Sequence, residues 1–351
     1  MERLTPLPWQ EALWRQLAAS PERIPHALML HGARGIGKRH FARALAHALL
    51  CEAPDREGRS CGQCPSCHLL AAENHPDLRW LMPEIDLPLR DDSEEATEPV
   101  STSAKPTKAS REIRIDQVRA ITEFLTLAAH RGGRRVVVLA PAEALNGPAA
   151  NALLKLLEEP PPGAIFLVVT DEIDAVLPTV RSRCVLLRAP FPSRDAALAW
   201  LRGQGVTDAE DALAESGGAP MELAQPGDED TRRVAPELKS RLLELLAKGA
   251  RLTAPDIVAA VPKDISVGDA IRLFQRWGWD LLAERTAARV RYYPKHKRAL
   301  AAVARDCDPE RLLEWVGQLA NAQATADHPL NARLALEGLL MGYLEAVRPA
   351  R

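Results

Sequence analysis

The sequence predicts an α/β fold built on a parallel sheet, followed by a region made of helices alone. Strand-like apolar runs alternate with amphipathic helical segments as far as about residue 190. This alternation is typical of a parallel sheet whose faces are covered by helices. Beyond residue 190 the strand-like runs cease, and apolar residues recur at the spacing of helices instead.

The first predicted strand spans 27–30 and leads through a glycine-rich loop into a helix. In that helix Phe41, Leu45 and Leu49 recur every four residues, so they form a single apolar stripe. The elements that follow are a helix over 116–129, a strand over 135–139, a helix over 148–158 and a strand over 165–170. Three consecutive prolines stop the second of these helices, because proline cannot donate a backbone hydrogen bond.

Residues 83–110 interrupt this pattern. The segment holds seven acidic residues and many Ser, Thr and Pro, with almost no periodic apolar signal. Such a composition cannot bury a core, so we predict a mobile surface insertion.

Composition narrows the classes of function. A net charge of −2 excludes a protein that coats nucleic acid by charge alone. No apolar run reaches the eighteen residues of a membrane span, and the first ten residues lack the core of a signal peptide. We therefore expect a cytoplasmic protein, whose clustered cysteines favour a metal over disulfides.

A glycine-rich motif follows the first strand. Gly32, Gly35, Gly37 and Lys38 have the spacing G-x-x-x-x-G-K of a phosphate-binding loop, between a strand and a helix. However, Arg39 stands where a working loop needs Ser or Thr to hold Mg²⁺. The strand over 135–139 also runs into Ala-Pro, where acidic residues would hold the metal and orient the attacking water.

Three interpretations of this degenerate loop stay open. The glycines could serve only the geometry of the strand-to-helix turn. The loop could bind nucleotide without turnover, or it could still hydrolyse ATP. We favour the first and regard ATP binding as doubtful.

Cys51, Cys61, Cys64 and Cys67 place four thiols within seventeen positions. Zn²⁺ prefers four such soft ligands in a tetrahedron, and the two C-x-x-C steps supply them with little loop strain. An iron–sulfur cluster is the rival, since C-x-x-C-x-x-C also occurs in ferredoxins, but there the next cysteine usually lies downstream. We predict a structural zinc site. Isolated histidines such as His75 are expected in turns or at the surface.

Two further segments carry a family resemblance. Residues 151–161 read NALLKLLEEPP, and a predicted strand leads on to Ser182-Arg183-Cys184. Together with the phosphate loop and the cysteines upstream, in the same order, they resemble the clamp-loader AAA+ family. The resemblance covers about residues 4–225 and rests beyond them on helical pattern alone.

The resemblance implies a RecA-like AAA+ domain over 1–189, a small helical lid over 190–230 and a helical oligomerisation collar over 231–351. The collar matches apolar stripes over 238–246, 271–282, 312–319 and 334–344.

The resemblance also implies a role. Catalytic γ/τ subunits keep a sensor arginine where this chain has Met221. This loss, together with Arg39 and the Ala-Pro pair, matches a subunit without ATPase activity. Arg183 would then act in trans, as an arginine finger on the ATP of a neighbouring subunit. Arg183 is the one catalytic residue that the resemblance implies. We expect no polymerase site and no competent ATPase site in this chain.

The implied partners are the γ/τ and δ subunits of the DNA polymerase III clamp loader, the sliding clamp, and primed DNA reached through the assembled loader. Two alternatives remain. One is an active clamp-loader ATPase resembling γ/τ, and the other is a zinc-binding scaffold outside replication.

Overall fold

The computed structural model describes residues 3–18, 24–86, 110–127, 130, 133–223, 236–261, 267–324 and 332–348. The chain forms two compact units, Met1–Ala196 and Ala197–Arg351. Most of the predicted insertion, residues 87–109, lies outside the described residues. No helix in the described part of the chain is long and apolar enough to cross a membrane.

The first unit is built on a five-stranded parallel sheet with strand order β2-β3-β4-β1-β5, so β2 and β5 are the edges. The strands are β1 (Ala27–His31), β2 (Leu78–Leu81), β3 (Arg135–Leu139), β4 (Ala164–Thr170) and β5 (Val185–Arg188). The predicted α/β class with a parallel sheet is confirmed, because every strand pair in the described sheet is parallel.

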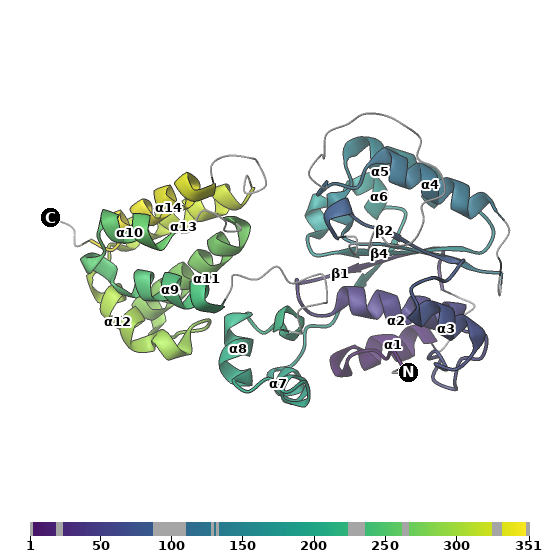
Figure 1. The fold of residues 1–351 in the computed structure, drawn as a ribbon, viewed down its shortest axis with the longest axis horizontal. Coiled ribbons are helices and arrows are strands. Elements are labelled where there is room, and N and C mark those ends of the chain that lie inside the picture. Colours follow the sequence, from purple (N-terminus) through teal and green to yellow (C-terminus); the bar gives the residue numbers. More distant parts are fainter. Residues whose placement is uncertain are drawn as a thin grey trace, which may run out of the picture. The chain divides into compact units, whose positions relative to one another are not determined.

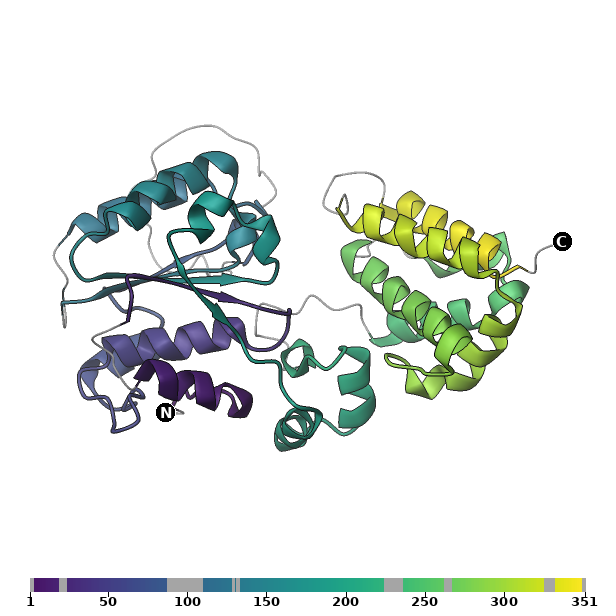
Figure 2. The same cartoon turned by 180° about the vertical axis from the view of Figure 1, so that it is seen from behind.

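Helices cover both faces of the sheet (Figure 1). On one side α4 packs against α5, and their apolar residues share a core with alternate residues of β1, β3 and β4. On the other side α2 packs on the sheet, while α1 and α3 pack on α2; Figure 2 shows the same two layers from behind. The helices are α1 (Glu11–Ala18), α2 (Lys38–Leu50), α3 (Pro65–Ala71), α4 (Ile115–Thr126), α5 (Gly147–Glu158) and α6 (Pro178–Arg181).

The central strands form where the sequence predicted them, because β3 and β4 are unbroken apolar runs buried on both faces. The two edge strands were not predicted. β2 has only four residues, with Arg79 exposed, and three of the four residues of β5 are exposed. An edge strand buries less of its surface, so its apolar pattern is weaker and its pairing depends on the neighbouring strand.

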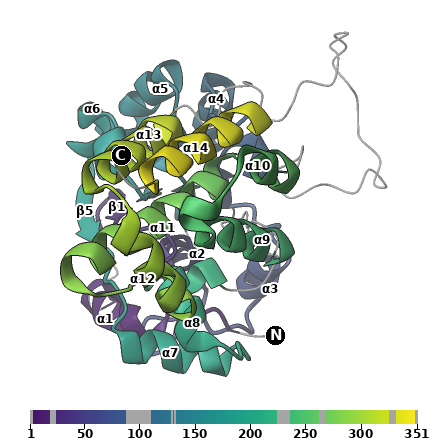
Figure 3. The ribbon, with the colours of Figure 1, turned by 90° about the vertical axis from the view of Figure 1, so that its left-hand side faces the viewer.

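The second unit is helical. α7 (Arg194–Gly203) and α8 (Ala209–Glu215) share a small apolar cluster, which includes Leu201 and Leu213. Six further helices share a second and larger core, in which α11 packs against α12 and α13, and α13 against α14 (Figure 3). They are α9 (Pro236–Ala247), α10 (Ala254–Ala260), α11 (Val267–Ala287), α12 (Lys297–Asp306), α13 (Pro309–Ala324) and α14 (Ala332–Ala346).

All four predicted apolar stripes fall on helices of this larger core: α9, α11, α13 and α14. The lid and collar boundaries at 189 and 230 stay predictions. Ion pairs join the two helical groups within the second unit, among them Arg276–Glu222 at 2.8 Å and Lys295–Asp208 at 3.1 Å.

Candidate functional site

The phosphate-type loop connects β1 to α2 and holds all four of its predicted residues. Gly35 and Gly37 have φ angles of 72° and 86°, in the left-handed region that glycine adopts without strain. Gly37 directly precedes the first residue of α2, Lys38. The loop therefore has the strand–turn–helix context that a phosphate site requires.

Lys38 has no hydrogen-bond donor left for a phosphate. Its ammonium group donates to the carbonyl oxygens of Gly32 at 2.9 Å and Ala33 at 2.7 Å, and it forms an ion pair with the Asp171 carboxylate. An ammonium group has three N–H donors, and here each has an acceptor. The side chain is also only 2% exposed, so these three contacts are shielded from water.

The positions that hold Mg²⁺ in a working phosphate loop also differ in this chain. Arg39 is directed to Asp86, at 3.6 Å, in the short 3-10 helix after β2. Ala140 and Pro141 follow β3 and offer no carboxylate. These positions therefore cannot supply the hydroxyl and acidic ligands that Mg²⁺–ATP uses.

Sequence reasoning missed two acidic residues beside the loop, Asp171 and Glu143. Glu143 accepts a hydrogen bond from the backbone N–H of Asp171 at 3.1 Å, and burial raises the pKa of its carboxyl group. Asp171 directly follows β4, at the carboxyl end of a parallel strand, where ligand-binding residues of such sheets gather. That rule could have found Asp171 from the sequence.

The four predicted cysteines lie together, with every pair of sulfur atoms within 4.8 Å. The Sγ–Sγ distances are 3.9 Å for Cys51–Cys64, 3.9 Å for Cys61–Cys67 and 3.6 Å for Cys51–Cys67. Four sulfurs at the usual Zn–S distance of about 2.3 Å in a tetrahedron lie about 3.8 Å apart. The cluster therefore fits one tetrahedral metal ion.

Backbone N–H groups point at these sulfurs. The N–H groups of Gln63 and Cys64 donate to the Cys61 Sγ, at 3.5 and 3.3 Å, and lower the pKa of that thiol to about 6. Burial raises the pKa of the Cys51 and Cys67 thiols. A divalent cation would hold all four as thiolates, because its charge offsets the cost of burying them.

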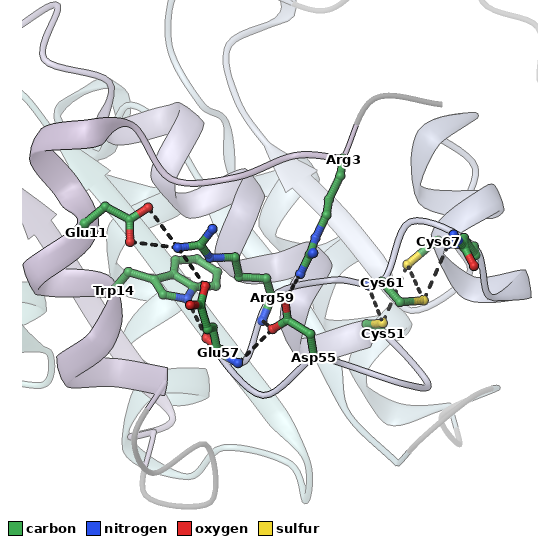
Figure 4. Close-up of polar contacts among 10 residues, drawn as sticks. Arg3, Glu11, Trp14, Cys51, Asp55, Glu57, Arg59, Cys61 and Cys67 are labelled. Carbon is green, nitrogen blue, oxygen red and sulfur yellow. Dashed lines mark hydrogen bonds and ion pairs between the residues drawn. The ribbon is translucent and has the colours of Figure 1, made fainter.

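The loop between Cys51 and Cys61 is braced against α1 (Figure 4). Arg59 forms an ion pair with Glu11 at 2.8 Å, and the Trp14 indole donates to the Glu57 carbonyl oxygen at 3.0 Å. Asp55 accepts hydrogen bonds from the backbone N–H groups of Glu57 and Arg59, both at 2.9 Å. These contacts present Cys51 and Cys61 on a fixed loop.

A buried network supports α3, which carries Cys67. Ser66 donates to the Leu50 carbonyl oxygen at 2.6 Å, and the His75 ring lies 2.6 Å from the same hydroxyl. The other ring nitrogen of His75 accepts the backbone N–H of Asp77 at 3.1 Å. His75 lies in a turn as expected, since its carbonyl oxygen accepts the Leu78 N–H at 3.2 Å. Its burial was not expected: the side chain is 3% exposed, and its hydrogen bonds offset the cost of that burial.

Arg183 lies just after α6, as its motif predicted. Its Nη1 donates to the Thr179 carbonyl oxygen at 2.9 Å and to the Ser182 hydroxyl at 3.2 Å, and its Nη2 forms an ion pair with Glu158. The side chain remains 33% exposed, while its Nε is buried. Arg181 pairs instead with Asp174 at 3.0 Å.

Several large apolar side chains lie close to Arg183 along the chain and are exposed. Leu177 precedes α6, and Val185 and Leu186 begin the edge strand β5; they are 43%, 49% and 46% exposed. Phe191, just beyond β5, is 52% exposed. Exposed apolar residues on an unpaired strand edge are typical of a surface that another protein covers.

Comparisons with known proteins identify the family. Residues 9–192, more than half of the chain, match the family model described as DNA polymerase III, delta subunit. The chain belongs to this family. The resemblance to clamp-loader proteins predicted from NALLKLLEEPP and Ser-Arg-Cys is thereby confirmed.

Relatives of this DNA polymerase III family include subunit delta' of Pseudomonas aeruginosa, 41% identical over 218 residues, or 61% of this chain and 59% of that protein. Subunit delta' of Escherichia coli is 36% identical over 62% of this chain and 60% of its own length. The chain thus spans about three fifths of the curated relatives it matches. A gamma subunit-related protein of Thermotoga maritima aligns over 97% of this chain and 100% of its own, with 18% identity and a TM-score of 0.42.

Proposed function

We propose that this chain is a clamp-loader subunit of DNA replication that does not hydrolyse ATP itself and supplies Arg183 to the ATP of a neighbouring subunit. The observation that carries the proposal is the position of Arg183, partly exposed and flanked by an uncovered apolar strand edge. A guanidinium on a surface suited to another protein can reach a phosphate bound by that protein.

The phosphate loop supports the inactive half of the proposal. Lys38 is occupied by two carbonyl groups and Asp171, and Arg39 pairs with Asp86. Ala140 and Pro141 leave both the metal and the attacking water without a carboxylate. This arrangement disfavours the alternative of an active γ/τ-like ATPase, and the family match disfavours a scaffold outside replication.

The partners in this proposal are γ/τ and δ, together with the sliding clamp and, through the assembled loader, primed DNA. The relatives named DNA polymerase III subunit delta' support this set. The complex would work in the cytoplasm, where reduced thiols remain available to a metal.

We further propose that Cys51, Cys61, Cys64 and Cys67 hold one structural Zn²⁺. The spacing of the sulfurs fits a tetrahedral ion. Four protein ligands leave no open position for water, so the ion would shape the loop and would not take part in a reaction.

The test is Arg183→Ala in a loader assembled from purified subunits. We expect normal assembly and a lower DNA- and clamp-stimulated ATPase rate. Removing an arginine finger commonly costs roughly 10³–10⁵ in rate at the affected site. The loss for the whole complex should be smaller, because only one site borrows its arginine from this chain. Arg183→Lys should restore little, because lysine lacks the planar fork that grips phosphate oxygens.

Arg181→Ala is the matched control, because Arg181 lies two residues away and pairs with the almost fully exposed Asp174. It should behave nearly as wild type. If the two variants exchange behaviour, the finger is Arg181. If Arg183→Ala complexes hydrolyse ATP and load clamps normally, the proposed role in trans is wrong.

A further inference from the structure

The two signature segments of this chain meet in one ion pair. Glu158, from NALLKLLEEPP, is the last residue of α5, and Arg183 belongs to the Ser-Arg-Cys segment beyond β4 and α6. The Glu158 carboxylate pairs with the Nη2 of Arg183. Helices α5 and α6 also pack against each other, so the pair lies on a contact between two ordered elements.

The guanidinium is held from two sides. Glu158 binds the Nη2, while the Thr179 carbonyl oxygen and the Ser182 hydroxyl accept from the Nη1. Glu158 is the only charged one of these three contacts. Nη2 carries two N–H groups, and among the described residues its one acceptor is Glu158.

This ion pair has little value as a stabiliser of the fold. The Glu158 side chain is 47% exposed and that of Arg183 is 33% exposed. Pairs that are exposed to this extent contribute little to folding stability, because water screens them and two long side chains lose freedom. An arginine that must meet a phosphate in one geometry, in contrast, benefits from having its rotamers restricted in advance.

We propose that Glu158 is a positioning residue that orients Arg183 toward the ATP of the adjoining subunit. This inference rests on the proposed role of Arg183 and adds a second residue to it. It also explains why Glu158 in NALLKLLEEPP and Arg183 in Ser-Arg-Cys occur together in one chain: the first orients the second. Glu158 touches neither nucleotide nor metal and acts only through the guanidinium.

The test measures the stimulated ATPase of the assembled loader with four forms of this chain: wild type, Glu158→Ala, Arg183→Ala and the double variant. Glu158→Ala should lower the rate at the one site that Arg183 serves roughly three- to tenfold, as expected when a weak orienting pair is lost, and the rate of the whole loader by less than Arg183→Ala does. In the Arg183→Ala background the same change should have no further effect, because its only route of action is gone. Glu158→Gln should retain part of the rate through its amide oxygen.

Glu159→Ala is the matched control, since Glu159 is an exposed glutamate one residue further on that forms no ion pair with another described residue. It should leave the rate unchanged. Assembly and thermal unfolding of each variant show whether the fold is intact.

The outcomes separate the two proposals. If Arg183→Ala is impaired but Glu158→Ala is unchanged or faster, Glu158 does not position the arginine. A Glu158→Ala loss of equal size in both backgrounds also overturns this inference, because Glu158 would then act elsewhere. If Arg183→Ala itself has a normal rate, the proposed function fails first.

Discussion

At the scale of single residues, Lys38 decides what the phosphate loop can do. Sequence spacing places it where a lysine meets the β- and γ-phosphates of a nucleotide. In the folded chain its ammonium is buried and binds Gly32, Ala33 and Asp171. A phosphate would have to displace the Asp171 carboxylate from this buried ammonium, which opposes binding.

Asp171→Ala should therefore raise the affinity of the isolated chain for an ATP analogue. Removing the carboxylate frees one donor of Lys38 and removes a negative charge from the site. A rise of at least about tenfold is expected, equivalent to one charge-assisted hydrogen bond. The measurement is an equilibrium titration with a fluorescent ATP analogue, with and without Mg²⁺.

No hydrolysis should accompany the tighter binding, because Ala140 and Pro141 still supply no carboxylate. The control is Asp174→Ala, which removes an exposed acid three residues further on and should not change the affinity. Equal affinities for wild type and Asp171→Ala would show that Asp171 does not block the loop.

At the scale of elements, the short helix α3 depends on the cysteine cluster at its start. The Cys64 Sγ accepts a hydrogen bond from the Cys67 backbone N–H at 3.4 Å, so a proposed metal ligand also caps the helix. With only seven residues, α3 is too short to be stable alone. Its order relies on the cluster, on α2 and on the Ser66 network.

Purified wild-type protein should carry about one zinc per chain, and Cys64→Ser should lose it. The serine hydroxyl is a poor ligand for Zn²⁺ where a thiolate is needed, so both the ion and the order of α3 should suffer. Elemental analysis measures the metal. Cys184→Ser is the control, because Cys184 lies outside the cluster and should not affect the zinc content.

If elemental analysis of freshly purified protein found iron and no zinc, the four cysteines would hold an iron–sulfur cluster and the zinc prediction would be wrong. Full zinc content in Cys64→Ser would show that the ligand set is wrong. Assembly of the variant into the loader should be retained, since the exposed edge strand β5 and helices α9–α14 are separate elements from the cysteine cluster.

At the scale of the whole molecule, the six helices α9–α14 have a core of their own. It contains large buried side chains, among them Phe274, Trp277, Trp315 and Tyr343. The Trp277 indole donates to the Tyr343 hydroxyl at 3.2 Å, and that hydroxyl donates to the Leu246 carbonyl oxygen at 2.6 Å. Three helices distant in the sequence are thereby joined at one buried point.

We therefore expect a fragment of residues 236–351 to fold by itself. Urea unfolding, followed by circular dichroism, should show one cooperative transition. Trp277→Ala in the same fragment should lower the free energy of unfolding by about 3–5 kcal/mol, because it leaves a cavity in the core.

The contrary result would be a fragment without a cooperative transition. Helices α9–α14 would then need the ion pairs that join them to the preceding segment, such as Arg276–Glu222 and Lys295–Asp208. A longer fragment that begins at residue 197 would separate this explanation from simple failure to fold.

The features that depend on local pattern could be predicted from the amino-acid sequence. The α/β class, the central strands β3 and β4, the four core stripes of the helical region and the four clustered cysteines were all predicted correctly. Each depends on spacing along the chain, through the period of a strand or helix or the reach of a short loop. The family resemblance likewise followed from short, contiguous segments.

The contacts between segments far apart in the chain could not be predicted and became visible in the folded protein. The pairs Lys38–Asp171 and Glu158–Arg183 join residues 133 and 25 positions apart, brought together by the order of the strands. His75 is buried because Ser66 and Asp77 satisfy its ring nitrogens, and the edge strands form because a neighbour pairs with them. The physical reason is common to all: partners far apart in sequence leave no periodic signal, and they acquire their energy only when the sheet and its helices have assembled.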